Sequence, residues 1–184
     1  MWFRKQLFRL RGAIWAAFFF VALLIASPTT SGIAIGIVSV LAGQAIRFWA
    51  AGTIGRYRGE RVSAEELVTW GPYAFCRNPL YVGNFFIGLG WATIAGWGIA
   101  PFYAGVFYLL YAIGIVPLEE KFLLDTFGDE YARYRSKTPK FLPHLPSAGE
   151  RTGPFSLSVL VQSERYSVLV TLFGTILLCL RTLV

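Results

Sequence analysis

The chain has 184 residues, of which 55% are hydrophobic and 15% charged, a composition too apolar for a soluble domain of this length. The formal net charge is +7, but the basic residues stand beside apolar runs, which indicates membrane topology and anionic lipid rather than nucleic-acid binding. A single histidine and two cysteines without a Cys-x-x-Cys pair leave little scope for a metal site. We therefore expect one membrane-embedded domain over residues 1–184, with no nucleic-acid partner and no metal.

Five apolar runs are expected to cross the bilayer as helices, at about 12–27, 32–51, 80–96, 101–117 and 166–181. Several are shorter than the roughly 20 residues of an ideal span, a difference that snorkelling arginines, flanking aromatics and local thinning can make up. One or two of them could instead be re-entrant. The first run imitates a signal peptide, but its cleavage pattern is poor, so we expect it to remain as a helix.

The connections between the runs alternate in charge. Residues 27–32 and 95–101 contain no Lys or Arg. The basic residues lie before the first run and in the second and fourth connections, and include Arg4, Lys5, Arg9, Arg11, Arg56, Arg58, Arg61, Lys121, Arg133, Arg135, Lys137, Lys140 and Arg151. Because basic loops remain in the cytoplasm, we expect the N-terminus inside and the C-terminus outside, in a prokaryotic inner membrane.

The segment after the fourth run has the pattern of an amphipathic helix. Pro117 suits its first position, and an apolar stripe recurs at helical spacing, at Leu118, Phe122, Leu123, Phe127, Tyr131 and Tyr134. We expect this helix at the cytoplasmic surface, unbroken or broken near Gly128. A proline-rich loop at 138–154 then leads to the last span, with or without an interfacial turn at 155–165. The expected fold class is all-α: a polytopic integral membrane protein with five transmembrane helices and a cytoplasmic interfacial amphipathic helix.

Polar residues stand at the start of the third run, in the order Arg77-Asn78-Pro79-x-Tyr81. They can be read as a helix start, with Asn78 as N-cap, Pro79 at the first position, and Arg77 and Tyr81 as interface anchors. Asn84 fits that interpretation less well, because an amide inside a span needs a polar partner or a cavity. The alternative is a polar site cut into the helix end.

A pair of glycines and a pair of glutamates also allow either a structural or a ligand-binding interpretation. Gly88 and Gly90 favour close helix packing and do not form a dinucleotide-binding fingerprint. Glu119 and Glu120 fit a solvated helix start, or alternatively a site for an amine, a sulfonium or ribose hydroxyls. Aromatic faces that can also hold a cation follow in the same segment, at Tyr131 and Tyr134.

The order of these motifs is more specific than any one of them. RNPxYxGN, then GxG, then EExxLxxxFGxEYxxY and finally KFLP occur along residues 55–146. In this the chain resembles the isoprenylcysteine carboxyl methyltransferase family and the related phospholipid N-methyltransferases, which are small integral membrane enzymes that use S-adenosylmethionine. The first two spans and the last one match that family only in type.

The resemblance implies a cofactor region over about residues 70–146. It implies cofactor-binding roles for Asn78, Pro79, Tyr81, Gly88, Gly90, Glu119, Glu120, Tyr131 and Tyr134. Arg77 and Glu120 are the expected catalytic residues. The chain departs from the family at Asn78, where many members have His, and this removes the obvious general base.

The expected reaction is methyl transfer from S-adenosylmethionine to a membrane-soluble acceptor. A carboxylate is already a nucleophile at neutral pH and needs only a positioning cation, for which Arg77, Arg47 and Arg133 are candidates, so O-methylation of a lipid-linked carboxylate is favoured. An apolar passage for the acceptor is expected at Phe85, Phe86, Phe107, Tyr108 and Tyr111. The alternatives are a phospholipid N-methyltransferase, an NADPH-dependent lipid reductase and a non-catalytic membrane protein.

Overall fold

The apolar runs form helices because a chain in lipid must satisfy its backbone polar groups internally. The computed structural model describes residues 2–54 and 66–183, and in these ranges the secondary structure is helical, with no strand. The helices are α1 (Trp2–Leu24), α2 (Thr30–Ile54), α3 (Pro72–Phe75), α4 (Pro79–Ala95), α5 (Ile99–Phe107), the π-helix η1 (Tyr108–Ile115), α6 (Val116–Lys137), the 3₁₀ turn η2 (Ala148–Glu150), α7 (Leu157–Leu180) and the 3₁₀ turn η3 (Arg181–Leu183).

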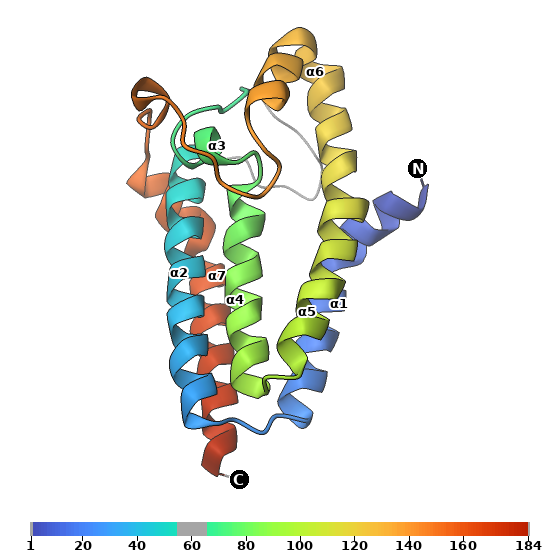
Figure 1. Cartoon of the computed structure of the whole chain (residues 1–184), viewed down its shortest axis with the longest axis vertical. Coiled ribbons are helices and arrows are strands. Elements are labelled where there is room, and N and C mark those ends of the chain that lie inside the picture. The colour runs from blue at the N-terminus through green and yellow to red at the C-terminus, as the bar shows by residue number, and fades with distance from the viewer. Residues whose placement is uncertain (1, 55–65, 184) are drawn as a thin grey trace.

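The long helices run antiparallel in one bundle, with α4 between α2 and α5 and with α7 against α2 and α4 (Figure 1). Within the described residues, four helical stretches are long and apolar enough to cross a membrane, namely Gln6–Leu24, Thr30–Ile54, Ile99–Lys137 and Leu157–Leu180. The prediction of an all-α membrane protein is confirmed. The count of five spans stays a prediction, because α4 has only 17 residues.

The fourth run and the expected amphipathic helix form one continuous helix rather than two. Residues 99–137 run on through α5, η1 and α6, and the chain changes direction within α6 at Gly128, where φ is +51°. Glycine tolerates this left-handed backbone because it has no Cβ. The break expected near Gly128 is therefore present, and only the residues beyond it leave the axis of the span.

The last helix also differs from the expected division. It begins at Leu157, after Ser156, whose hydroxyl accepts a hydrogen bond from the Val159 N–H as an N-cap. Residues 157–165 are thus the first turns of α7, not a separate interfacial turn. This difference places Glu164 and Arg165 within a long helix that packs in the bundle.

Glycines allow α2 and α4 to approach closely. A Cβ on Gly90 would lie 2.5 Å from the Gly36 carbonyl oxygen, and a Cβ on Gly43 would lie 2.6 Å from the Gly83 carbonyl oxygen. These distances leave no room for a side chain, so α2 and α4 pack backbone to backbone. Gly90 is buried in this contact, so the presence of glycine at this position is explained by close helix packing.

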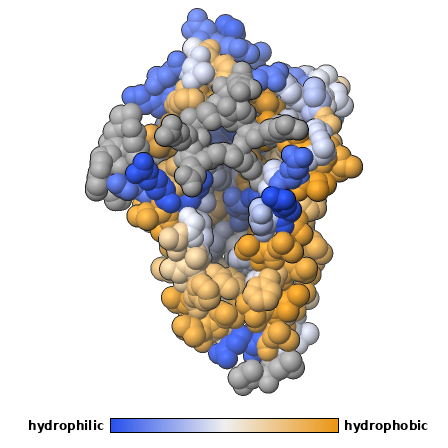
Figure 2. All heavy atoms as spheres, turned by 180° about the vertical axis from the view of Figure 1, so that it is seen from behind, coloured by the Kyte–Doolittle hydropathy of each residue, from blue (hydrophilic) through white to orange (hydrophobic). Residues whose placement is uncertain are grey.

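The two ends of the bundle differ in polarity. One end, called the loop end below, carries α3, the last turns of α6 and the loop at 138–154 (Figure 1). Hydrophilic residues gather at this end, and hydrophobic residues surround most of the bundle below it (Figure 2). The opposite end has the two short connections around residues 25–29 and 96–98 and the C-terminal end of α7. The basic residues expected in the second connection, Arg56, Arg58 and Arg61, lie outside the described residues.

Candidate functional site

The Arg-Asn-Pro motif is tied to the loop that follows α6. The helix α4 begins at Pro79 with Asn78 as its N-cap residue, as the sequence predicts, but the Asn78 side chain makes no cap hydrogen bond. Its Nδ2 instead donates to the Lys140 carbonyl oxygen at 3.0 Å, and the Arg77 N–H donates to the Pro139 carbonyl oxygen at 2.9 Å. The motif therefore fixes the loop end of α4 against residues 139–140.

Arg77 and Glu120 form a buried ion pair. Nη2 of Arg77 lies 2.8 Å and Nε 3.1 Å from Oε1 of Glu120, and the two side chains are only 9% and 8% exposed. Nη1 of Arg77 also donates to the carbonyl oxygens of Arg135 and Thr138. The pair predicted to be catalytic thus joins the residue before the N-cap of α4 to both ends of α6, and each charge is compensated by the other.

Tyr81 and Glu119 form a second polar contact beside this pair. The Tyr81 hydroxyl donates to Oε1 of Glu119 at 2.6 Å, a charge-assisted hydrogen bond. The Tyr81 ring packs on the Tyr111 ring with centroids 4.6 Å apart, and the Tyr111 hydroxyl accepts from Nε1 of Trp15 at 3.0 Å. A carboxylate and two aromatic faces therefore meet where α4 and α6 enter the bundle.

The predicted Tyr-x-x-Tyr residues lie beyond Gly128, in the part of α6 that turns back over the loop end. Tyr134 donates its hydroxyl to the Tyr73 carbonyl oxygen at 2.7 Å, which ties α6 to α3. Tyr131 is 1% exposed, and its hydroxyl makes no hydrogen bond of ideal geometry in the described part of the chain. The charged neighbours of this hydroxyl are Glu120, Arg77 and Arg135, and the Arg77 guanidinium is within reach as a donor. Tyr131 therefore lies buried beside the Arg77–Glu120 ion pair.

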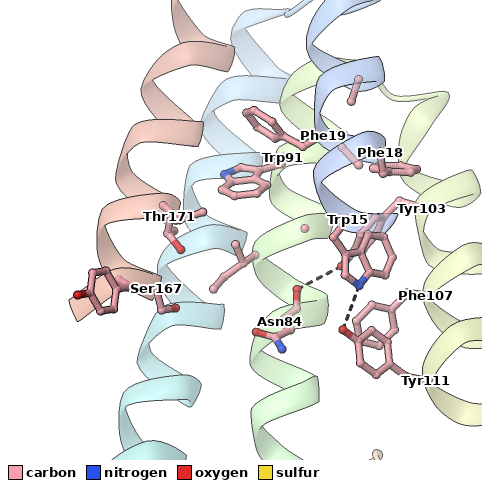
Figure 3. Close-up of a pocket in the computed structure, with 16 residues that line it drawn as sticks. Trp15, Phe18, Phe19, Asn84, Trp91, Tyr103, Phe107, Tyr111, Ser167 and Thr171 are labelled. Carbon is pink, nitrogen blue, oxygen red and sulfur yellow. Dashed lines mark hydrogen bonds between the residues drawn. The ribbon is translucent and has the colours of Figure 1, made fainter. Parts of the chain in front are cut away.

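An apolar cavity of about 370 Å³ lies deeper in the bundle, between α1, α4, the α5–η1 segment and α7. Figure 3 shows Asn84 and Tyr111 at one end of the cavity, and Phe19 and Trp91 at the other. Because Tyr111 also packs on Tyr81, the first end adjoins the Tyr81–Glu119 contact. The polar groups near the loop end and the apolar cavity are therefore neighbours.

The residues predicted to line a passage fall into three groups. Phe107 and Tyr111 line the cavity. Phe85 packs against Phe107, with ring centroids 5.1 Å apart, and is not itself a lining residue, nor is Phe86, whose backbone carbonyl accepts from Ser39. Tyr108 is 61% exposed on the outside of the bundle, because the π-helix turns it away from the cavity that Tyr111 faces. Of the residues predicted to line a passage, Phe107 and Tyr111 thus face this cavity and Tyr108 does not.

The two glycines of the Gly-x-Gly motif have different surroundings. Gly88 lines the cavity, and a Cβ there would overlap the Tyr103 hydroxyl at 2.2 Å. Gly90 lies on the α2–α4 contact described above. Neither glycine adjoins the Glu119 and Glu120 side chains in a contact that the structure shows.

A polar network in the middle of the bundle was missed by sequence reasoning. Nε and Nη2 of Arg47 on α2 donate to the two carboxylate oxygens of Glu164 on α7, each at 3.0 Å. Nη1 of Arg47 donates to Oδ1 of Asn84 on α4. The Arg47 and Glu164 side chains are 10% and 2% exposed. Asn84 was expected to need a polar partner. Glu164 was missed because it lies in the segment at 155–165, for which an interfacial turn was considered. An acidic residue next to an apolar run is nevertheless a signal for a buried polar site.

Comparison with known proteins places this arrangement in a family. The sequence model described as phospholipid methyltransferase matches residues 30–130, more than half of the chain. A cobalt-zinc-cadmium resistance protein of Cupriavidus metallidurans is 34% identical over 60% of this chain and 49% of its own length. The protein-S-isoprenylcysteine O-methyltransferase of Schizosaccharomyces pombe is 35% identical over 44% of this chain and 34% of its own length. Methanethiol S-methyltransferase 1 of Bradyrhizobium diazoefficiens is 37% identical over 39% of this chain and 24% of its own length.

The chain matches at most about half the length of these curated relatives. No solved structure matches it. The matched range contains α2, α4, the Arg-Asn-Pro motif and both glutamates. It therefore includes both members of the Arg77–Glu120 and Tyr81–Glu119 contacts. The resemblance predicted from the motif order is confirmed, and the chain belongs to the phospholipid methyltransferase family.

Proposed function

We propose that the protein transfers a methyl group from S-adenosylmethionine to an acceptor held in the membrane. One observation carries this proposal: Tyr111 belongs both to the apolar cavity and to the aromatic pair beside Glu119. A polar site for a water-soluble donor and an apolar site for a lipid-like acceptor would then meet at one side chain. Relatives named as methyltransferases of isoprenylcysteine and methanethiol support the reaction type.

The residues near the loop end fit S-adenosylmethionine by their chemistry. Glu119 and Glu120 offer carboxylates to an amine or to ribose hydroxyls, and the Tyr131 hydroxyl lies buried beside Glu120. Tyr81 and Tyr111 offer aromatic faces, which attract cations. When bound, S-adenosylmethionine supplies an electrophilic methyl group on a sulfonium. The contribution of the chain is to hold and orient the two reactants and to exclude water.

The acceptor is proposed to carry a carboxylate on an apolar tail. A carboxylate needs no base, whereas an ammonium must lose a proton first. The only histidine, His144, lies in the loop at 138–154, where its Nε2 is 2.8 Å from the Ala74 carbonyl oxygen, and it is not among the residues that line the cavity. A tail in the cavity would also be kept from water, at about 0.8 kcal/mol per CH₂ group. N-methylation of a phospholipid is the second candidate, favoured by the description of the family.

The test uses the purified chain in lipid nanodiscs with methyl-labelled S-adenosylmethionine and a membrane lipid extract. We expect label in a lipid product, and alkaline hydrolysis should release that label as volatile methanol, because methyl esters are base-labile. Label that resists alkali would indicate N- or S-methylation instead. Absence of transfer together with binding of NADPH would favour a lipid reductase, and absence of both ligands would favour a non-catalytic protein.

A further inference from the structure

The orientation of the Asn84 amide follows from its partner. Arginine has only N–H donors, so the atom of Asn84 that faces Arg47 must be the carbonyl Oδ1. Nδ2 therefore points away from Arg47, and Asn84 lines the cavity. The bidentate ion pair with Glu164 fixes the position of the Arg47 guanidinium. Residues of α2 and α7 therefore determine whether the oxygen or the nitrogen of the Asn84 amide is available to the cavity.

The polar atoms of Asn84 and Tyr111 that remain available at this end of the cavity are hydrogen-bond donors. The backbone carbonyl of Asn84 already accepts a hydrogen bond from the Tyr103 hydroxyl, at 3.2 Å. The Tyr111 hydroxyl accepts from Trp15, so its own proton remains available for donation. Figure 3 shows Asn84 and Tyr111 at the same end of the cavity. Nδ2 of Asn84 and the Tyr111 hydroxyl thus offer two donors at this end of a mostly apolar cavity, whose α7 side adds the Ser167 and Thr171 hydroxyls. Two donors match the oxygens of a carboxylate and do not match an ammonium group, which can only donate.

We propose that Asn84 determines the head-group specificity of the acceptor by donating its amide N–H to a carboxylate or carbonyl oxygen. Arg47 and Glu164 act as positioning residues that keep the amide in this orientation. The inference rests on the proposed function, since it assigns the cavity to the acceptor. Recognition would come from directed donors rather than from net charge, because Glu164 neutralises Arg47.

The test measures binding without methyl transfer. The probes are a long-chain carboxylate with a brominated tail and the primary amine with the same tail, added to the full chain in nanodiscs of zwitterionic lipid. Bromine quenches the fluorescence of Trp15 and Trp91, which line the cavity. The quenching that is still measured in a Trp15→Phe/Trp91→Phe variant comes from probe dissolved in the bilayer, and it is subtracted as background. We expect the wild-type protein to bind the carboxylate at least about tenfold more tightly than the amine.

Two variants separate recognition from folding. Asn84→Asp keeps an oxygen for Arg47 but places a second oxygen in the cavity, so the carboxylate should bind about tenfold more weakly while the amine binds no more weakly. The double variant Arg47→Met/Glu164→Met removes the ion pair without changing net charge, and such apolar replacements of buried pairs are often neutral in stability. It should abolish the preference while both probes still bind, because Asn84 can then present either end of its amide.

Thr175→Val is the control, because it removes a hydrogen bond between α4 and α7, from Nε1 of Trp91, that does not involve Asn84, Arg47 or Glu164. It should leave the preference unchanged. Three results would overturn the inference: no preference in the wild type, an equal loss for both probes in Asn84→Asp, or a preference that persists in the double variant. A protein that prefers the carboxylate but transfers no methyl group would refute the proposed function alone, and methyl transfer without the preference would refute this inference alone.

Discussion

At the residue scale, two neighbouring glutamates have different surroundings. Glu120 is buried against Arg77, and the pair joins α6 to the start of α4. Glu119 is half-buried, and its contact is with the Tyr81 hydroxyl, next to the aromatic end of the cavity. We infer that Glu120 acts mainly by holding the loop end together, and that Glu119 has more freedom to contact a ligand.

Substitution by glutamine should separate these two roles. Glu119→Gln should weaken the binding of S-adenosylmethionine about tenfold, because it removes a charge that can bind an amine, and should change the melting temperature little. Glu120→Gln should lower stability by about 2 kcal/mol, since Arg77 loses its compensating charge. Calorimetric titration and thermal unfolding in detergent measure the two effects. Glu130→Gln, an exposed residue of the same helix, is the control, and equal effects of all three variants would contradict the assignment.

At the element scale, the π-helix η1 determines which aromatic side chains reach the site. Tyr111 and Leu110 are buried in it, whereas Tyr108 and Leu109 are exposed. A π-helix shifts the angular position of each residue relative to an α-helix, and such segments are frequent at functional sites. The prediction named Tyr108 among the aromatic residues of the fourth run without assigning them to a helix face, and the π-helix places Tyr108 and Tyr111 on different faces.

The close contact of α2 and α4 yields a prediction about helix packing. Gly90→Ala should lower stability by about 1–3 kcal/mol, because its Cβ would lie 2.5 Å from the Gly36 carbonyl oxygen and the helices would have to separate. Gly105→Ala on α5 should be neutral, since nothing lies within 4 Å of the added Cβ. Thermal unfolding in one detergent compares them. If Gly90→Ala kept full stability and lost only cofactor binding, the cofactor role implied by the resemblance would be preferred.

At the scale of the whole molecule, the orientation in the membrane is open to a direct test. The connections near Thr30 and Trp97 lie at the end opposite to the loop end, and both residues are exposed. We expect Thr30→Cys and Trp97→Cys to react with a membrane-impermeant maleimide from outside the cell, because their connections carry no Lys or Arg.

The labelling experiment needs only one change to the native cysteines. Cys76 is buried near the loop end, and burial raises the pKa of its thiol to about 11, so it stays protonated and unreactive at neutral pH. Cys179 in α7 is half-buried and is replaced by alanine. Labelling of either new cysteine only after the cells are opened would reverse the predicted orientation.

The sequence by itself determined the helical membrane class, the apolar core of each long helix and the family, but not where α1 and α7 begin. Apolar runs and the order of short motifs are local properties of the sequence. In a bilayer, a helix is the simplest structure in which the backbone N–H and C=O groups all find hydrogen-bond partners. The start of α4 at Pro79 and the break at Gly128 were predicted for the same reason, since proline and glycine act on their own backbone.

Only the tertiary structure decided which polar groups pair. Arg47, Asn84 and Glu164 come from three helices and are separated by tens of residues, so no local pattern pairs them. The motif order predicted that Tyr81 and both glutamates converge on one site, but not that Arg77 pairs with Glu120 and Tyr81 with Glu119. A buried polar group is stabilised only by a partner at hydrogen-bond distance, and that distance is set by how the helices pack around their glycines and the cavity.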